Sequence, residues 1–221
     1  MNGAYRWIQV GGMSFQAAEL IKFALLIWLA GFLTQKIKDG QITNYQETFK
    51  PLVIALAVVG FIVAVLQSDL GSTGVIVAIM AAMAFVAGLP LKKVLLIGGL
   101  VTLGTVLAVS MSSYRRDRLL TYLHPERDCL NAGYQSCQAL NAIGSGGMVG
   151  VGLGHSVYAY GYLPESANDS IFAIVAEKFG FIGTTILLAL FVGLFSRLKK
   201  IIEHTEDIYN RSIVTGILAW I

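Results

Sequence analysis

The sequence predicts an all-α integral membrane protein, a polytopic helical bundle with a long extracytoplasmic loop. Three observations predict it: 56% of the 221 residues are hydrophobic, only 13% are charged, and the mean hydropathy is +0.70. A soluble domain carries about 25% charged residues, so roughly half of the usual solvating side chains are missing. This composition excludes a soluble enzyme and a disordered regulator. The net charge of +3 is too small to indicate nucleic-acid binding.

Apolar runs of nearly membrane-spanning length are separated by charged or Pro/Gly-rich segments. They predict membrane helices at about 15–33, 51–68, 72–90, 94–112 and 171–195, and a sixth that begins near 212 and stops at Ile221. The chain starts without a signal peptide, and its last helix is too short to cross a bilayer. We therefore expect a fragment of a longer protein, with one partial transmembrane domain over 1–221.

The basic residues are distributed unequally between the predicted connections. Nine of the sixteen Lys and Arg residues fall in alternate connections at 34–50, 91–93 and 196–211, whereas five fall in 1–14 and 113–170. Cytoplasmic loops carry the excess of Lys and Arg, so the nine mark the cytoplasmic face. The 113–170 segment is therefore expected on the extracytoplasmic side.

This outside segment is far longer than a usual connection, and such loops are functional or disordered. Its aromatic and aliphatic content argues against disorder, so we expect it to fold against the bundle, with a short amphipathic helix at 130–142. Its most biased stretch is Gly144-Ser-Gly-Gly-Met-Val-Gly-Val-Gly-Leu-Gly154. We interpret this stretch first as a tight re-entrant turn, and second as a backbone cradle for a pyrophosphate.

Both cysteines of the chain, Cys129 and Cys137, lie in the outside segment, where an oxidising compartment would permit a disulfide. If residues 130–137 are helical, the two Cα atoms lie about 12 Å apart, which is beyond disulfide reach. The disulfide is therefore left open. Neither His nor Cys accompanies the pair at zinc-site spacing, so no metal site is predicted.

Ionisable residues inside membrane segments are candidates for function, because burying them there is costly. Glu19 and Lys22 lie three apart and share a helix face, and their alternative role is an ion pair that holds helices together. Asp69 interrupts two apolar runs. Glu177 and Lys178 follow the start of a predicted helix, and we interpret them as lying at interfacial depth.

Two charged features lie at the ends of the outside segment. Arg115, Arg116 and Arg118 cluster where a predicted helix leaves the membrane. They are interpreted either as an anchor to anionic head groups or as a phosphate clamp. Asp169 lies immediately before a predicted helix, so capping of that helix is its first interpretation and catalysis its second.

Several short motifs follow one another along the chain. In order they are Gly3-Ala-Tyr-Arg-Trp-Ile8, Gln16-Ala-Ala-Glu-Leu-Ile-Lys22, Gln67-Ser-Asp-Leu-Gly-Ser72, Tyr114-Arg115 with Arg118, His124-Pro-Glu126, Gly133-Tyr-Gln-Ser-Cys-Gln138, Ala142-Ile-Gly-Ser-Gly-Gly147, Tyr162-Leu-Pro-Glu165 and Asp169 with Ile171-Phe-Ala-Ile174. Together they resemble the SEDS family (shape, elongation, division and sporulation), the FtsW/RodA group of peptidoglycan glycosyltransferases. Gly154-His-Ser-Val157 is more similar to the division branch, FtsW, than to the elongation branch. The family's His beside the key acid is replaced here by Asn168.

The resemblance implies a multi-pass enzyme of the bacterial cytoplasmic membrane that polymerises lipid II on the extracytoplasmic face and releases undecaprenyl pyrophosphate. It implies that Asp169 is the catalytic residue, acting as general base or orienting the attacking hydroxyl. The matched motifs and the charged positions supply the candidates for substrate binding. These are Arg6, Glu19, Lys22, Asp69, Arg115, Arg118, Tyr134, Gln138 and Glu165.

The resemblance also implies partners in the membrane. They are a class B penicillin-binding protein transpeptidase, which cross-links the new glycan, and other membrane proteins of the division complex. A divalent cation, Mg²⁺ or Mn²⁺, beside Asp169 is left open. Two alternative functions are kept: a lipid II transporter or flippase that uses Glu19, Lys22 and Asp69 as a polar pathway, and a non-catalytic scaffold of the division complex.

Overall fold

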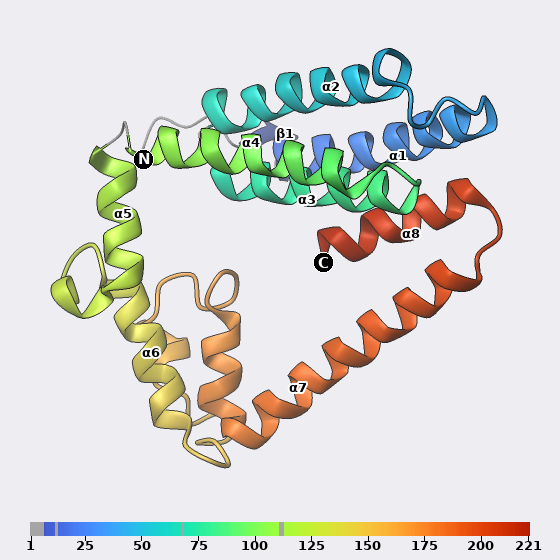
Figure 1. Ribbon diagram of the computed structural model, residues 1–221. Helices are drawn as coiled ribbons and strands as arrows, with labels where there is room; N and C mark the ends of the chain where they lie inside the picture. The colour runs from blue at the N-terminus through green and yellow to red at the C-terminus, as the bar shows by residue number, and fades with distance from the viewer. Residues whose placement is uncertain (1–6, 12, 68, 111–112) are drawn as a thin grey trace. The chain divides into compact units, whose positions relative to one another are not determined.

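The computed structural model describes residues 7–11, 13–67, 69–110 and 113–221 (Figure 1). They form two compact units, one of Met1–Thr105 with Phe195–Ile221 and one of Val106–Leu194. Helices α4 (Leu91–Ser110) and α7 (Ile171–His204) each continue from one unit into the other. The single domain expected over the whole chain stays a prediction.

The first unit is a bundle of helices. Beside α4 it contains α1 (Ala17–Lys38), α2 (Lys50–Phe61), α3 (Leu70–Val86) and α8 (Ile208–Trp220), and the π-helical turns η1 (Tyr45–Phe49) and η2 (Ile62–Leu66) extend α2 at its two ends. Figure 1 shows α1 to α4 running alongside one another, and α8 packs against α1 and α3. The core consists of buried aliphatic side chains from these helices.

Helix α8 approaches its neighbours closely because its inner face carries small residues. Ser212, Thr215 and Gly216 are buried there. A Cβ added to Gly216 would lie 2.8 Å from Met83 Sδ of α3 and 2.9 Å from a side-chain carbon of Leu26 of α1. Small residues at this spacing are typical of helices that pack within membranes.

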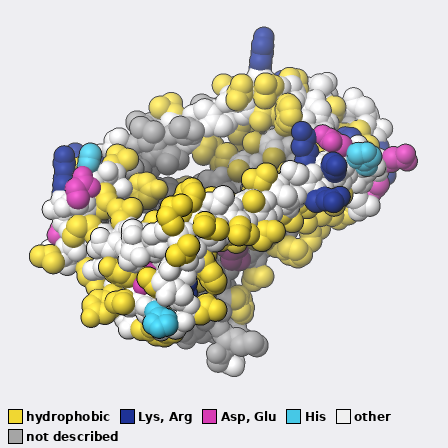
Figure 2. Space-filling model, turned by 90° about the horizontal axis from the view of Figure 1, so that it is seen from below, with side chains coloured by type: hydrophobic (Ala, Val, Ile, Leu, Met, Phe, Trp, Pro, Cys, Tyr) yellow, Lys and Arg dark blue, Asp and Glu magenta, His cyan; other side chains and the backbone are white. Residues whose placement is uncertain are grey.

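Within the described ranges, three helical segments are long and apolar enough to cross a membrane. They are Ala17–Lys38, Tyr45–Ala64 and Ile171–His204, and Gly71–Val86 is a shorter apolar helix. Their outward faces stay apolar, and Figure 2 shows one side of the molecule on which hydrophobic side chains predominate and charged ones form small groups. Apolar surface of this extent indicates contact with lipid. The helical, multi-pass membrane fold expected from the sequence is confirmed.

Several elements differ from the sequence prediction. The last helix begins at Ile208 rather than near 212, because the Asp207 side chain accepts a hydrogen bond from Asn210 N (3.1 Å) and caps it. Residues predicted as loop form α5 (Ser113–Leu123). The helix expected at 130–142 is α6 (Tyr134–Gly146), which begins later because Asn131–Gly133 form a turn.

A β-hairpin that the sequence did not predict precedes α1. Strands β1 (Trp7–Val10) and β2 (Met13–Gln16) are antiparallel, and Trp7 pairs with Gln16. Four-residue strands are too short for their alternation to stand out from an apolar run. The hairpin leads the chain directly into the first membrane helix.

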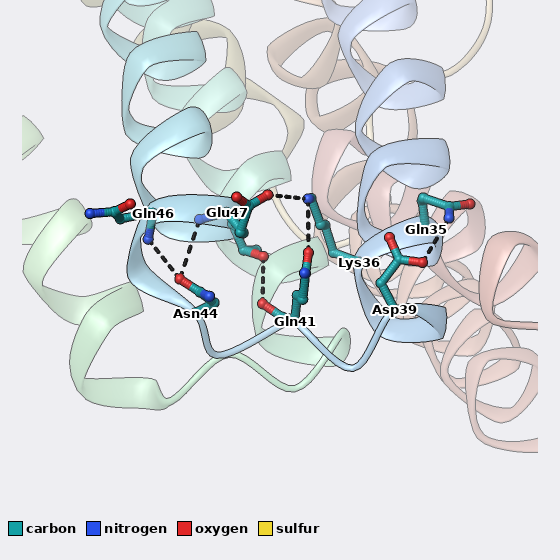
Figure 3. A network of polar contacts seen from close by, with 8 residues as sticks. Gln35, Lys36, Asp39, Gln41, Asn44, Gln46 and Glu47 are labelled. Atoms are coloured by element: carbon teal, nitrogen blue, oxygen red, sulfur yellow. Dashed lines mark hydrogen bonds and ion pairs between the residues drawn. The ribbon is translucent and has the colours of Figure 1, made fainter.

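The connection between α1 and α2, predicted to be cytoplasmic, is closed by its own side chains (Figure 3). Lys36 Nζ lies 2.8 Å from Glu47 Oε2 and donates to Gln41 Oε1 at 3.2 Å. The Asn44 side chain caps η1 by accepting a hydrogen bond from Gln46 N (2.9 Å). These contacts stabilise the fold of the connection. They account for the charged and polar side chains that lie together in it.

Cys129 and Cys137 form a disulfide, with their Cα atoms 5.6 Å apart. The helical spacing considered for the pair was wrong, because the turn before α6 folds the chain back: Gly133 N donates to Asp128 O at 2.9 Å. Hydrogen bonds to the Asp128 carboxylate, first from the Asn131 side chain and then from Ala132 N, lower the pKa of Asp128. The disulfide between Cys129 and Cys137 therefore closes an ordered turn.

Replacing both cysteines with serine is expected to lower the free energy of unfolding by about 2–3 kcal/mol, because the open loop gains entropy in the unfolded chain. The measurement is thermal unfolding of the detergent-solubilised protein with and without reductant. The wild type should lose stability on reduction, and the double serine variant should not change. A maleimide probe that labels both thiols of the unreduced wild type would contradict the disulfide.

Candidate functional site

In the first unit, Asp69 joins the starts of two helices. Its carboxylate caps α3 by accepting hydrogen bonds from Ser72 N (3.0 Å) and Ser72 Oγ (2.8 Å). It also accepts a hydrogen bond from Gln16 Nε2 of β2, at the start of α1 (3.2 Å). Because both carboxylate oxygens already have protein donors, Asp69 is held in place by the fold of this unit.

Glu19 and Lys22, one to two turns further along α1, form an ion pair at 2.6 Å. The Lys22 side chain is only 6% exposed, whereas that of Glu19 is 48% exposed. The Lys22 ammonium also lies 5.2 Å from the centre of the Trp220 ring of α8, in cation–π range. The ion pair lies within α1 and joins no two helices; the contact with Trp220 is what ties Lys22 to α8, while the Glu19 carboxylate stays accessible.

Changing Asp69 to alanine is expected to lower the free energy of unfolding by about 1–2 kcal/mol, because α3 loses its N-cap. Asp69→Asn is the matched control, since asparagine caps helices equally well and keeps one acceptor oxygen. Thermal unfolding of the two variants in detergent separates them. Equal losses from both would show that the negative charge, not the cap, is what matters.

In the second unit, α7 is broken at Gly180, whose φ of 64° and ψ of −164° are not helical. Residues 147–152 of the Gly-rich stretch bond to the backbone of α7 on both sides of the break. Val151 N and Gly152 N donate to the carbonyl oxygens of Glu177 and Lys178, at 2.9 and 3.1 Å. On the other side, Phe181 N and Ile182 N donate to the carbonyl oxygens of Gly147 and Met148, at 2.9 and 3.1 Å. The loop thus supplies the hydrogen bonds that a continuous helix would make itself.

Three glycines allow this insertion. A Cβ on Gly146 would collide with the carbonyl of Ala176, and one on Gly150 with the carbonyl of Lys178. Gly180 likewise lies against the Gly150 amide. The amides of Gly150, Val151 and Gly152 bond to carbonyls within this unit. The glycines thus form the re-entrant turn, and these three amides are not free to hold a pyrophosphate.

Asp169 lies in the tight turn that leads into α7. The Glu165 carbonyl accepts hydrogen bonds from Asn168 N (3.0 Å) and Ser170 N (3.2 Å), which folds the turn. The Asp169 side chain is exposed and, within the described part of the chain, neither accepts a capping hydrogen bond from α7 nor pairs with a cation. Its carboxylate is therefore available for a ligand, which weakens the capping interpretation.

Two other predicted residues of this unit, Glu165 and Tyr134, lie in this turn or bond to the segment before it. Glu165 adopts a φ of 51°, unusual for a residue with a side chain, and accepts a hydrogen bond from Asn168 Nδ2 at 2.7 Å. Tyr134 Oη donates to the carbonyl of Tyr162 at 3.0 Å, which ties α6 to the segment before the turn. Gln138 lies half-buried on α6. Backbone strain of this kind tends to occur at functional sites.

The predicted site residues thus fall into two sets, one in each unit. Glu19, Lys22 and Asp69 belong to the first unit, and Tyr134, Gln138, Glu165 and Asp169 belong to the second. Arg6 lies outside the described residues. The same holds for the side chains of Arg115 and Arg118, whose backbone belongs to α5.

Comparison with known proteins decides the family. The family model described as cell cycle protein, FtsW/RodA/SpoVE, matches residues 1–221, the whole chain. The chain belongs to the FtsW/RodA/SpoVE family. The resemblance drawn from the sequence motifs is confirmed.

Relatives within the FtsW/RodA/SpoVE family carry informative names. The chain is 39% identical to stage V sporulation protein E of Bacillus subtilis and 36% identical to the probable peptidoglycan glycosyltransferase FtsW of Coxiella burnetii; each alignment covers 100% of this chain and 59% of the relative. A solved structure described as a peptidoglycan synthase complex that coordinates polymerization and crosslinking matches with a TM-score of 0.69 and 26% identity, over 100% of this chain and 60% of that one. The chain thus spans less than two thirds of their length.

Sequence reasoning missed the structural roles of three residues in this FtsW/RodA/SpoVE chain. Trp220 covers Lys22, Gly180 breaks α7, and Glu177 is buried rather than interfacial, with an exposed fraction of 1%. A glycine and an acid three residues apart in an apolar helix were the available signal. Their roles depend on loop residues about 20 to 30 positions away in sequence, which no local pattern reveals.

Proposed function

We propose that the protein is a peptidoglycan glycosyltransferase that polymerises lipid II on the extracytoplasmic face of the bacterial cytoplasmic membrane. The observation that carries the proposal is the Asp169 carboxylate. It is exposed, stands in a turn folded by its neighbours, and is not used by the fold in any described contact. Relatives that share 36–37% of their residues with the chain are named as probable enzymes of this kind.

Asp169 would act on the attacking sugar. Its carboxylate would accept the proton of the acceptor's 4-hydroxyl, or orient that hydroxyl, as its oxygen forms a bond to the anomeric carbon of the growing chain. The bond from that carbon to the pyrophosphate oxygen breaks, and undecaprenyl pyrophosphate leaves. Glu165 and Tyr134, beside the same turn, are proposed to bind the substrate, with Gln138 on the same helix as Tyr134.

The leaving pyrophosphate needs positive charge, which Arg6, Arg115 and Arg118 are proposed to supply. Lys22 is proposed to contribute less, because it is buried between Glu19 and Trp220. Among the described residues, three or more His, Cys, Asp or Glu side chains nowhere gather as a metal site. A Mg²⁺ or Mn²⁺ ion beside Asp169 stays a prediction, and no step proposed here passes through it.

The proposed partner is a class B penicillin-binding protein transpeptidase, within a larger division complex. Support comes from the solved structure of similar fold, whose description joins polymerization and crosslinking in one complex. A polymerase that releases glycan outside the membrane requires such a partner, since a second activity must join the new strands.

The test is reconstitution of the complete gene product in liposomes with labelled lipid II and the transpeptidase. Glycan polymer that disappears in the Asp169→Ala variant is the expected result. Lipid II that crosses the bilayer without polymer would indicate the transporter or flippase. If neither reaction occurs and the complex still assembles, the scaffold function is the correct one.

A further inference from the structure

The Glu177 side chain is buried in α7 one turn before the break, and both of its carboxylate oxygens accept hydrogen bonds. Ser156 Oγ donates to Oε2 at 2.5 Å, and Val157 N and Tyr158 N donate to Oε1 at 2.7 and 3.3 Å. Within the described part of the chain, no Lys, Arg or His pairs with it. A buried carboxylate is costly unless donors surround it, so these three contacts explain how Glu177 is tolerated.

The donors belong to a segment that returns to the same helix. Leu163 N donates to the carbonyl of Tyr158 at 3.1 Å, and Ser156 Oγ itself accepts a hydrogen bond from Ala159 N at 3.1 Å. Further on, Ser170 Oγ donates to the carbonyl of Pro164 at 3.3 Å. Residues 156–158 are thus fixed to α7 by the Glu177 side chain, and Ser170, directly before α7 and next to Asp169, closes the turn that begins at Pro164.

The part of α7 before the break is short and is supported separately. It ends at Gly180, and Ala173 and Ile174 pack against Ala142 of α6 and Leu163 of the returning segment. A carboxylate only accepts hydrogen bonds, so it requires Ser156, Val157 and Tyr158 all to point toward it. Glu177 therefore specifies one arrangement of the returning segment on this half-helix.

We propose that Glu177 is a positioning residue for the polymerisation reaction. Its buried carboxylate fixes residues 156–158, and through them the turn at 163–170, so that Asp169 is held in one orientation toward the substrate. The proposal rests on the proposed function. A displacement of about 1 Å at a reacting group can cost about 100-fold in rate, so a distant change of this kind can reach the chemistry.

The test compares Glu177→Gln and Glu177→Ala in the complete gene product reconstituted with its transpeptidase and labelled lipid II. Glutamine has the same shape but offers one acceptor oxygen, and alanine offers none. We expect kcat per folded molecule to fall roughly 10-fold and 100-fold respectively, with KM within about twofold of the wild type. Glu203→Gln, which removes an exposed acid from the same helix, is the matched control and should leave kcat unchanged.

A double variant separates positioning from a general loss of structure. If Glu177 acts through Asp169, Asp169→Asn with Glu177→Gln should be no slower than Asp169→Asn alone. The proposal is overturned if Glu177→Gln slows the Asp169→Asn variant by the same factor as it slows the wild type. A Glu177→Ala variant with the wild-type kcat would also overturn it.

Hydrogen exchange tests the proposal without an activity assay. The amides of 157–158 and of 163–170 should exchange faster in Glu177→Gln than in the wild type, while those of α8 should not. Unchanged exchange at 163–170 overturns the positioning role. Absence of polymer from the wild type contradicts the proposed function instead, so the two failures are distinguishable.

Discussion

Asp169→Ala is expected to lower the kcat of glycan polymerisation by about 10²–10⁴-fold, the usual contribution of a positioned general base. The side chain is exposed, so its removal leaves no cavity and should leave the thermal stability of the protein unchanged. The measurement is the initial rate of polymer formation from labelled lipid II by the reconstituted complex, normalised to folded protein.

Three further variants sharpen this prediction. Asp169→Asn keeps the shape but cannot take the proton, and it should be nearly as slow as alanine. Asp169→Glu keeps a carboxylate displaced by one methylene, and it should retain partial activity. Asp117→Asn, which changes an exposed acid of α5, is the matched control and should be fully active. Fast polymerisation by Asp169→Ala would show that the general base is another residue.

Gly146→Ala is expected to lower the free energy of unfolding by about 1–3 kcal/mol, because the added carbon meets the rigid carbonyl of Ala176. The loop would have to move out of the break in α7, so the hydrogen bonds of Val151 and Gly152 to α7 should weaken. Polymerisation should fall as well, since the same loop continues into the segment bound by Glu177.

Gly144→Ala is the matched control for this substitution. Gly144 lies two residues earlier in the same helix, is exposed, and has open space where a Cβ would be. Alanine favours helix, so this variant should be neutral or more stable by up to about 1 kcal/mol. Thermal unfolding in detergent compares the pair, and equal melting temperatures for both variants would show that the close contact at Gly146 does not matter.

Hydropathy predicted a membrane protein of several apolar helices, and three described segments are long and apolar enough to cross a bilayer, because such a helix must present a long apolar surface whatever its neighbours are. Their ends were less predictable, since they depend on single caps such as Asp207 before α8. The disulfide between Cys129 and Cys137 could not be decided, because it required knowing that α6 starts at Tyr134. A shift of a few residues in a helix start changes the distance between two cysteines by several ångströms.

The candidate site, too, was predictable where its signals are local in sequence and unpredictable where its contacts are distant. Asp169 was found because motifs and an acid before a helix are local features of the sequence. Glu177 was interpreted as interfacial, because its partners at 156–158 come from a distant loop, and two of its three donors are backbone amides. Backbone donors leave no trace in the choice of side chains, so the sequence carries little signal of this contact.

The break at Gly180 also has a consequence for how the protein responds to bilayer thickness. The helix after the break is long enough, at about 1.5 Å per residue, to cover roughly 36 Å, so it can cross the bilayer without the half-helix before it. A thicker or thinner bilayer changes the tilt of such a span. The Gly-rich loop bonds to the backbone on both sides of the break, so hydrophobic mismatch is expected to be absorbed in the helix after Ile182 and not in the half-helix that follows Asp169.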